Sequence, residues 1–476
     1  MSIPRHTALN LLGQLTPLLL ALFTIPVYLR LIGESRYGVL AIVWLLIGYF
    51  GLFDLGLGQA TAQRLSKASE GGPAERARVF WSAFIANIAL GLVGALVAWP
   101  VAGYFFSRQF SVDAALRAEL LSALPWIALT VPVATVTGVL AGTLQARERF
   151  LELNLVSAFG SALVQLAPLA VALFWTPSLA ALVPAVLAAR TATTLILFLR
   201  CGHHVFAGHP VTWDTAAAVQ LLRFGGWVTV TALVGPMMVI LDRFLIGILF
   251  GAKAVSQYTI PFQLVERTTV LSAALNFALF PRLATAPDPA DRLHLGLQGL
   301  RALAAVLSPL IAVCILLIGP FLAWWISPEL ATASTRLAQT LLLGFWINSL
   351  ALVPYTQLQA GGRPDLVAKC HAAELLPYLA LLYLALQQFG LVGAAAVFSL
   401  RAAVDFLLLA YLAGTLAAAA RLLAWPAVLL ALVFSAAAPP AWLSLPWHWA
   451  LGAALLVAHL AWSASQAPGA LRQLRL

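Results

Sequence analysis

Charged residues are scarce in this sequence. Asp, Glu, Lys and Arg make up 9% of its 476 residues, whereas hydrophobic residues make up 62%, and the mean hydropathy is +0.95. A water-soluble domain could not bury so much apolar surface in one core. The shortage of charge therefore argues against a soluble globular protein, and we expect an all-α polytopic membrane protein with no separate soluble domain.

Cysteines and nucleotide-binding motifs are also few or lacking. The three cysteines lie far apart and form no CxxC pair, which argues against a disulfide framework, a metal centre or redox chemistry. The stretch CGHHVFAGHP at 201–210 gathers one cysteine and three histidines, but it lacks metal-ligand spacing and is better explained as a solvated loop than as a zinc site. No GxxxxGK[ST] motif occurs, so we expect no ATP hydrolysis by this chain.

Long apolar runs fill the chain instead. A helix needs about 20 apolar residues to cross a hydrocarbon layer about 30 Å thick. The basic start of the chain is followed by an apolar run too long for a signal sequence, and we interpret that run as a retained first helix. The fourteen predicted spans are 7–30, 38–62, 80–106, 119–144, 153–175, 179–199, 226–250, 255–280, 300–326, 337–358, 366–388, 391–416, 423–442 and 444–464.

The distribution of Lys and Arg orients the predicted spans. If the N-terminus is cytoplasmic, seventeen of the 27 basic residues fall on the cytoplasmic side, six on the outer side and four inside spans. Membrane proteins retain basic residues on the cytoplasmic side. This bias explains the net charge of +10 without nucleic acid, and it predicts that both termini are cytoplasmic and that the number of spans is even.

A faint internal repeat relates two groups of six spans. At an offset of 218 residues Gly33 aligns with Gly251, and at an offset of 214 the tripeptide LQA at 144–146 aligns with the same tripeptide at 358–360. Transporters are often built from duplicated bundles, and an even number of spans between the copies predicts a pseudo-two-fold axis along the membrane normal. The predicted parts are an N-lobe at 1–200, a cytoplasmic connection at 201–225, a C-lobe at 226–420, and two peripheral spans with a cytoplasmic tail at 421–476.

Five short motifs extend over essentially the whole chain. They are YLRLIGESRYGVLAI at 28–42, FDLGLGQATAQRL at 53–65, LQARERFLELN at 144–154, FGAKAVSQYTI at 250–260 and LQAGGRPDLVAKC at 358–370. In these motifs the chain resembles the polysaccharide-transport branch of the multidrug/oligosaccharidyl-lipid/polysaccharide flippase superfamily. The resemblance implies two lobes around a central cavity that opens to each side of the bacterial inner membrane in turn. It also implies an undecaprenyl-pyrophosphate-linked oligosaccharide as cargo, and a cavity lined largely by the first, second, seventh and eighth spans.

Nine charged residues lie within the predicted spans and away from their ends. A charged side chain at the centre of a bilayer costs about 2.5 to 3.5 kcal/mol on insertion scales, so each of them should face protein or water and marks a candidate site. They are Asp54, Arg190, Asp242, Arg243, Glu266, Arg267, Glu374, Arg401 and Asp405.

Two pairs of neighbouring acid and base, on the seventh and eighth spans, form the main candidate site. Adjacent residues point about 100° apart on a helix, so we expect ion pairs between the helices. The expected pairs are Asp242 with Arg267, and Arg243 with Glu266. Alternatively, Arg243 and Arg267 bind the pyrophosphate, because guanidinium groups grip phosphate in a bidentate fashion and stay charged. Both arrangements can alternate, and Arg30, near the outer end of the first span, is assigned to the same pyrophosphate site.

Asp54, in the second span, is a candidate coupling group together with Asp242 and Glu266. It would be structural if it paired with a cation such as Arg64 or formed a hydrogen bond between helices. It would be functional if its protonation favoured one orientation of the cavity, because burial and a nearby phosphate both favour the neutral carboxyl group. The two interpretations stay open.

The remaining four intramembrane charges are predicted to be structural. Arg401 and Asp405 are four residues apart and share a helix face, which favours an internal ion pair. Arg190 lies near the repeat position of Arg401 at the offset of 214, so it should have a similar role in the first lobe. Glu374 is expected to pair with Lys369.

Transport without covalent chemistry is the function that this pattern favours. The leading hypothesis is a flippase that moves the lipid-linked oligosaccharide from the cytoplasmic to the outer leaflet for O-antigen, capsule or exopolysaccharide assembly. The alternative is a proton- or sodium-coupled multidrug or cation antiporter of the same superfamily. A membrane polymerase or ligase would need a large external loop, whereas the longest external connection here, between Phe106 and Glu119, has about a dozen residues. A channel remains compatible with the charge pattern.

The expected partners are the lipid-linked cargo, membrane lipids, and a polysaccharide polymerase and chain-length regulator of the same pathway, with no nucleic acid. We expect no cofactor and no metal. Coupling to a proton gradient, a sodium gradient or the membrane potential is left open.

Overall fold

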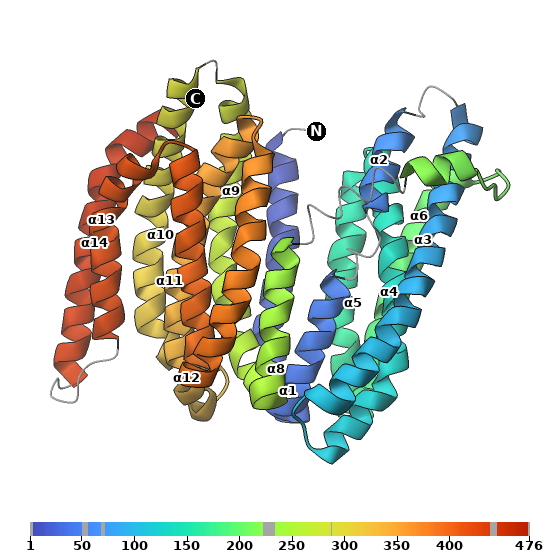
Figure 1. Ribbon diagram of the computed structural model, residues 1–476, viewed down its shortest axis with the longest axis horizontal. Coiled ribbons are helices and arrows are strands. Elements are labelled where there is room, and N and C mark those ends of the chain that lie inside the picture. The colour runs from blue at the N-terminus through green and yellow to red at the C-terminus, as the bar shows by residue number, and fades with distance from the viewer. Residues whose placement is uncertain are drawn as a thin grey trace. The chain divides into compact units, whose positions relative to one another are not determined.

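The protein consists of long helices joined by short connections (Figure 1). The computed structural model describes residues 3–49, 56–67, 72–221, 234–286, 288–437 and 445–474, and no strand occurs in these ranges. The predicted all-α class is therefore confirmed. The helices are α1 (Ile3–Tyr49), α2 (Leu57–Lys67), α3 (Gly72–Tyr104), α4 (Ala114–Ala146), α5 (Phe150–Phe174), α6 (Leu179–Cys201), α8 (Val234–Glu266), α9 (Val270–Thr285), α10 (Pro289–Trp325), α11 (Pro328–Ala360), α12 (Pro364–Leu412), α13 (Leu416–Ala436) and α14 (Leu445–Leu474).

Ten helical segments in the described ranges are long and apolar enough to cross a membrane. Three of them run through a glycine with non-helical backbone angles, so each consists of two helices joined end to end. These glycines are Gly33 in α1, Gly251 in α8 and Gly390 in α12. With the three segments counted as pairs and α14 added, the helices correspond to the fourteen predicted spans.

Contacts between distant residues of one helix show that the chain reverses at two of these glycines. The ring centroids of Tyr28 and Trp44 lie 5.4 Å apart across Gly33, and side-chain atoms of His371 and Asp405 lie 3.3 Å apart across Gly390. A straight helix rises 1.5 Å per residue and would separate these pairs by about 24 Å and about 51 Å. Helices α1 and α12 are therefore helical hairpins.

Helix boundaries repeat along the chain at the predicted offset. Helices α4 and α11 both have 33 residues, and their first and last residues are 214 positions apart. Each is preceded by a capping side chain, Asp113 or Ser327, which accepts a hydrogen bond from the backbone amide three residues later. Helices α5 and α12 also begin 214 positions apart. The sequence repeat is therefore a repeat of secondary structure.

Two compact units make up the chain, Met1–Ser256 and Gln257–Leu476, and the division between them falls inside α8. In the first unit α4 packs against α2, α3 and α6, and α1 packs against α5. In the second unit α11 packs between α10 and α12, while α13 and α14 pack on α10. The last two spans are therefore additions to the side of α10, as predicted, whereas the predicted lobe boundaries stay a prediction.

Large apolar side chains cover the outside of each unit. Leu96 is 70% exposed, Phe174 is 87% exposed and Trp324 is 81% exposed. Water would make such a surface prone to aggregation, whereas lipid chains solvate it. The exposed surface and the apolar helices together support a multi-pass membrane protein.

Candidate functional site

Helix α8 carries a buried acid and a buried base side by side. Asp242 is 1% exposed and Arg243 is 3% exposed. The Nη1 atom of Arg243 donates to both carboxylate oxygens of Asp242, each at 2.8 Å. This contact corrects the prediction that helix neighbours cannot pair. Their Cα–Cβ bonds do diverge, but the arginine side chain is long enough to bring its guanidinium group back to the adjacent carboxylate.

The connection between α3 and α4 holds this part of α8 in place. The hydroxyl of Ser111 donates to the carbonyl oxygen of Ile248 at 2.9 Å, and the amide of Ser111 donates to the carbonyl oxygen of Gly247 at 3.3 Å. Gly247 has no room for a side chain, because the ring of Phe110 occupies the place that a Cβ atom would take. The buried ion pair therefore lies on a closely packed segment.

An apolar cavity of about 360 Å³ lies beside this segment, within the first unit. Phe244, the residue after Arg243, lines the cavity and packs on Phe105 with ring centroids 4.8 Å apart. The other lining side chains come from α1, from α3 and the π-helical turn that follows it, and from α4, and they include Leu46 and Trp99. A permanently charged group and an apolar cavity are thus one residue apart along α8.

Of the other predicted members of this site, Glu266, Arg267 and Arg30 are among the described residues. Glu266, the last residue of α8, is exposed, and Arg267 is half-buried in the 3₁₀ turn that follows. Arg30 is exposed, three residues before the reversal at Gly33. Asp54 lies outside the described residues. The assignment of these residues to cargo binding or coupling stays a prediction.

The second unit contains a buried network of charges on the two arms of α12. The Nη1 atom of Arg401 lies 3.9 Å from Oε2 of Glu374, and its Nη2 atom donates to Oδ1 of Asn348 on α11 at 3.4 Å. The Nε2 atom of His371 lies 3.3 Å from Oδ1 of Asp405. The side chains of Glu374 and Asp405 are 6% and 8% exposed. The reversal of α12 thus brings two acids, an arginine and a histidine together.

These contacts correct two predictions about ion pairs. Instead of the pair within one helix arm expected for Arg401 and Asp405, the ion pairs cross the hairpin, from Arg401 to Glu374 and from His371 to Asp405. Glu374 is predicted to pair with Lys369, but the Nζ atom of Lys369 lies 3.3 Å from Oδ2 of Asp365. That pair has the favourable spacing of four residues with the acid first.

The network has more acids than permanent cations. Arg401 balances one of the two carboxylates, and His371 contacts the other. An uncompensated charge would be costly at this depth. The ring of Tyr355 lies parallel to that of His371, with centroids 6.3 Å apart. The arrangement gathers two acids around one permanent cation and one histidine, which makes it a candidate coupling site.

His371 could not be predicted from a count of charged residues, because histidine is counted as neutral. Its spacing from Glu374 is the signal that could reveal it. Residues three apart on a helix share a face, so His371 lies on the same side of the helix as Glu374.

Arg190 links two helices of the first unit. Its Nη2 atom donates to the carbonyl oxygen of Ile47 in α1 at 3.1 Å. A charged group inside a membrane helix is less costly when it donates to a backbone carbonyl group. The structural role predicted for Arg190 stays a prediction.

The stretch that contains cysteine and histidine is bound by its neighbours in the first unit. The Nε2 atom of His204 and the Nε atom of Arg200 lie 3.1 Å and 3.3 Å from the same oxygen of Glu152. The thiol of Cys201 donates to the carbonyl oxygen of Leu140 at 3.4 Å. These side chains therefore join α4, α5 and α6 at one end of the unit.

Comparison with known sequences identifies related proteins. A family model described as "Polysaccharide biosynthesis protein" matches residues 3–286, which is more than half of the chain. The "Putative O-antigen transporter" of Shigella flexneri is 28% identical over 413 residues, which cover 87% of this chain and 98% of that protein. The "Uncharacterized membrane protein EpsK" of Bacillus subtilis (strain 168) is 24% identical over 355 residues, which cover 72% of this chain and 69% of that protein.

Solved structures of the same fold are transporters. The lipid II flippase MurJ in an inward closed conformation superposes with a TM-score of 0.76 at 10% identity, covering 94% of this chain and 97% of that structure. An inward-facing multidrug resistance MATE family transporter of the MOP superfamily superposes with a TM-score of 0.70 at 13% identity, covering 85% of this chain and 95% of that structure. At these identities the likeness concerns the fold alone.

Proposed function

The chain belongs to the polysaccharide biosynthesis protein family, and we propose that it is a flippase for an undecaprenyl-pyrophosphate-linked oligosaccharide. It would carry this cargo by alternating access from the cytoplasmic to the outer leaflet of the bacterial inner membrane, with both termini in the cytoplasm. The product would enter O-antigen, capsule or exopolysaccharide assembly and pass to a polymerase and a chain-length regulator. The similarity to an O-antigen transporter over nearly its full length supports this class of cargo.

One observation in the first unit carries the proposal. The buried guanidinium group of Arg243 lies one residue from Phe244, which lines an apolar cavity of about 360 Å³. A lipid-linked pyrophosphate combines two phosphate charges with a long hydrocarbon chain, so it needs a cationic and an apolar surface next to each other. Asp242 offsets the cost of burying Arg243 when no cargo is bound, and a phosphate group can take over that role. We propose that Arg243 contacts the pyrophosphate, and that Arg267 and Arg30 contribute further positive charge.

The α12 network supplies the proposed coupling site. Glu374 and Asp405 together exceed the charge of Arg401, and His371 adds a second titratable partner. We propose that proton uptake by this group couples transport to the proton gradient, which supplies the energy in place of a bound cofactor. Protonation would change the net charge buried between the two arms of α12 and thereby favour one of two helix arrangements.

Transfer of labelled lipid-linked oligosaccharide in vesicles tests the proposal. The full-length protein should move label from one leaflet to the other, Arg243→Ala should abolish transfer, and Arg243→Lys should weaken it, because an ammonium group lacks the planar fork. The control is Arg421→Ala, which removes an exposed arginine whose Nε atom donates only within α13, to Ala417. Normal transfer by the Arg243→Ala variant would refute the site. Export of cationic dyes without transfer of the sugar lipid would instead favour the antiporter alternative.

A further inference from the structure

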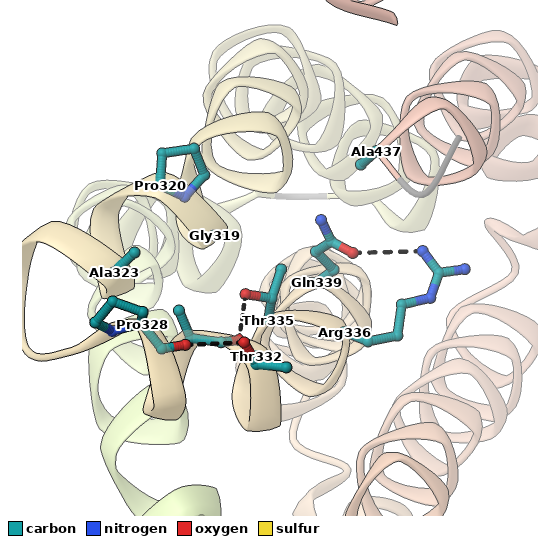
Figure 2. Close-up of a pocket in the computed structure, with 10 residues that line it drawn as sticks. Gly319, Pro320, Ala323, Pro328, Thr332, Thr335, Arg336, Gln339 and Ala437 are labelled. Atoms are coloured by element: carbon teal, nitrogen blue, oxygen red, sulfur yellow. Dashed lines mark hydrogen bonds between the residues drawn. The ribbon is translucent and has the colours of Figure 1, made fainter. Parts of the chain in front are cut away.

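A cavity of about 440 Å³ opens at the end of the second unit where α10 turns into α11. A volume of this size is typical of small-ligand sites. No Asp or Glu is among the described residues that line the cavity, which does not include the charged residues of α12. Figure 2 shows Gly319 and Pro320 of α10, Thr332, Thr335, Arg336 and Gln339 of α11, and Ala437 at the end of α13 around it.

Arg336 is fixed by neighbours at one end of its guanidinium group. Its Nη1 atom donates to the carbonyl oxygen of Phe434 at 3.0 Å and to Oε1 of Gln339 at 3.3 Å, and its Cζ atom lies 3.6 Å from the ring centroid of Phe434. Gln339 is fixed in turn, because its Nε2 atom donates to the carbonyl oxygen of Ile315 at 3.1 Å. None of the described residues accepts a hydrogen bond from Nε or Nη2 of Arg336. These two donors are therefore available to a ligand in a preset orientation.

The start of α11 adds positive potential near the cavity. Thr332 and Thr335 also line it, and their hydroxyl groups donate within α11, to the carbonyl oxygens of Pro328 at 2.9 Å and Ala331 at 2.6 Å. Helix α11 begins at Pro328, so the positive end of its dipole lies at the same end of the unit. The acid in this first turn, Glu329, is exposed and does not line the cavity. A phosphate group would thus meet guanidinium donors at the end of the unit where the helix dipole is positive.

Aromatic and apolar side chains place the cavity at the level of lipid headgroups. The rings of Phe321 and Trp325 stack with centroids 5.4 Å apart, and Trp324 is 81% exposed. Tryptophans gather at the boundary between hydrocarbon and water. Leu317 of α10 and Leu432 of α13 are each 49% exposed, closer to the middle of their helices. The cavity therefore has polar donors at its mouth and apolar surface for acyl chains beside it.

We propose that this cavity binds the phosphate headgroup of an anionic glycerophospholipid. The Nε and Nη2 atoms of Arg336 donate to phosphate oxygens, and the acyl chains lie along the exposed sides of α10 and α13. A bound lipid bridges α11 to α13, which Arg336 already joins through the carbonyl group of Phe434. The proposal goes beyond the function described above, because the ligand is a resident membrane lipid and not the transported cargo.

Native mass spectrometry of the full-length protein tests the proposal. With phosphatidylglycerol added to the detergent-solubilised protein, wild type should retain the lipid, and Arg336→Ala should bind it about tenfold more weakly, because charge-assisted hydrogen bonds are lost. Arg336→Lys should fall between them. The matched control is Arg421→Ala, which removes an exposed arginine of α13 that does not line the cavity. It should bind as wild type does.

A second variant separates lipid binding from the packing role of Arg336. Ala323 lines the cavity, so Ala323→Trp fills the space and leaves the arginine in place. This variant should also lose the lipid. Its thermal midpoint should equal that of the wild-type protein. Equal binding of zwitterionic phosphatidylcholine, or lipid retention by both Arg336→Ala and Ala323→Trp, would overturn the proposal. Binding of lipid-linked oligosaccharide or of soluble glycerol phosphate, without binding of phosphatidylglycerol, would assign the cavity to another phosphate source. That result would also overturn the proposal.

Discussion

Gly33 and Gly251 are 218 residues apart and share one backbone conformation, with φ of 76° and 80° and ψ of 167° and 179°. This region of backbone space is essentially restricted to glycine. Each glycine joins two helices of a predicted span pair, at matched positions of the repeat. The duplication therefore preserves a turn whose geometry depends on the absence of a side chain.

Replacing either glycine with alanine should destabilise the protein. Gly33→Ala should cost about 1 to 3 kcal/mol from backbone strain alone, because no atom lies within 4 Å of the added Cβ position. Gly251→Ala should cost more, because its Cβ atom would lie 2.6 Å from the carbonyl oxygen of Ser111. The thermal midpoint of the detergent-solubilised protein measures both effects.

Gly48→Ala is the matched control for these variants. Gly48 is exposed in α1, has no atom within 4 Å of a Cβ position and has no positive φ. Alanine should stabilise the helix there by up to about 1 kcal/mol. Equal thermal midpoints for the Gly33→Ala and Gly48→Ala variants would show that the turn does not require glycine.

Removing one member of the Asp242 and Arg243 pair should destabilise the protein, whereas removing both should not. Asp242→Asn leaves the arginine without its carboxylate and should cost about 3 to 5 kcal/mol. Replacing both residues with leucine should be close to neutral for stability, because two buried charges disappear together. The unfolding midpoint reports stability, and transfer of lipid-linked sugar reports function. A double variant that folds and still transports would rule out cargo binding by Arg243.

Neutralising the acids of α12 should uncouple transport from the proton gradient. Asp405→Asn and Glu374→Gln each remove the excess negative charge from the network, so transfer should no longer respond to an imposed pH difference across the vesicle membrane. Asp365→Asn is the control, because that acid is exposed near the start of α12 and pairs with Lys369. An unchanged response to the gradient in both buried variants would exclude the network as the coupling site.

The ion pair between Arg36 and Glu119 should add modestly to the stability of the first unit. Nε and Nη2 of Arg36 donate to the two oxygens of Glu119 at 3.0 Å and 2.6 Å, and the amide of Leu179 donates to Oε2 at 3.0 Å. The two side chains are 36% and 19% exposed, so solvent screens the pair. A double-mutant cycle with Arg36→Gln and Glu119→Gln should give a coupling energy of about 1 kcal/mol. A coupling near zero would mean that the pair is only incidental to the fold.

The helix pattern could be predicted from sequence because it depends on local properties. Hydropathy indicates the spans, and the alignment of LQA at 144–146 with 358–360 locates the last turns of α4 and α11, which end at Ala146 and Ala360. Each of these features is set by residues within one helix or at one turn. Six of the predicted spans appear as three continuous segments because the chain turns at a single glycine within each of them.

Ion-pair partners could not be predicted in the same way, because they depend on how side chains reach across space. Arg401 and Asp405 have ideal spacing for a pair within one helix, yet the hairpin at Gly390 offers Glu374 and His371 as partners. Arg243 takes its own neighbour, which the angle between adjacent side chains argues against. The predicted pyrophosphate and coupling roles of Asp54, Glu266 and Arg267 stay predictions.

The contact between Asp242 and Arg243 has a consequence for any rearrangement of α8. Opposite charges on two different helices have to be pulled apart whenever those helices slide past one another, and this separation is expensive where the dielectric constant is low. Consecutive residues travel together, so a displacement of α8 does not by itself separate this carboxylate from its guanidinium group. The helix can move without opening that bond.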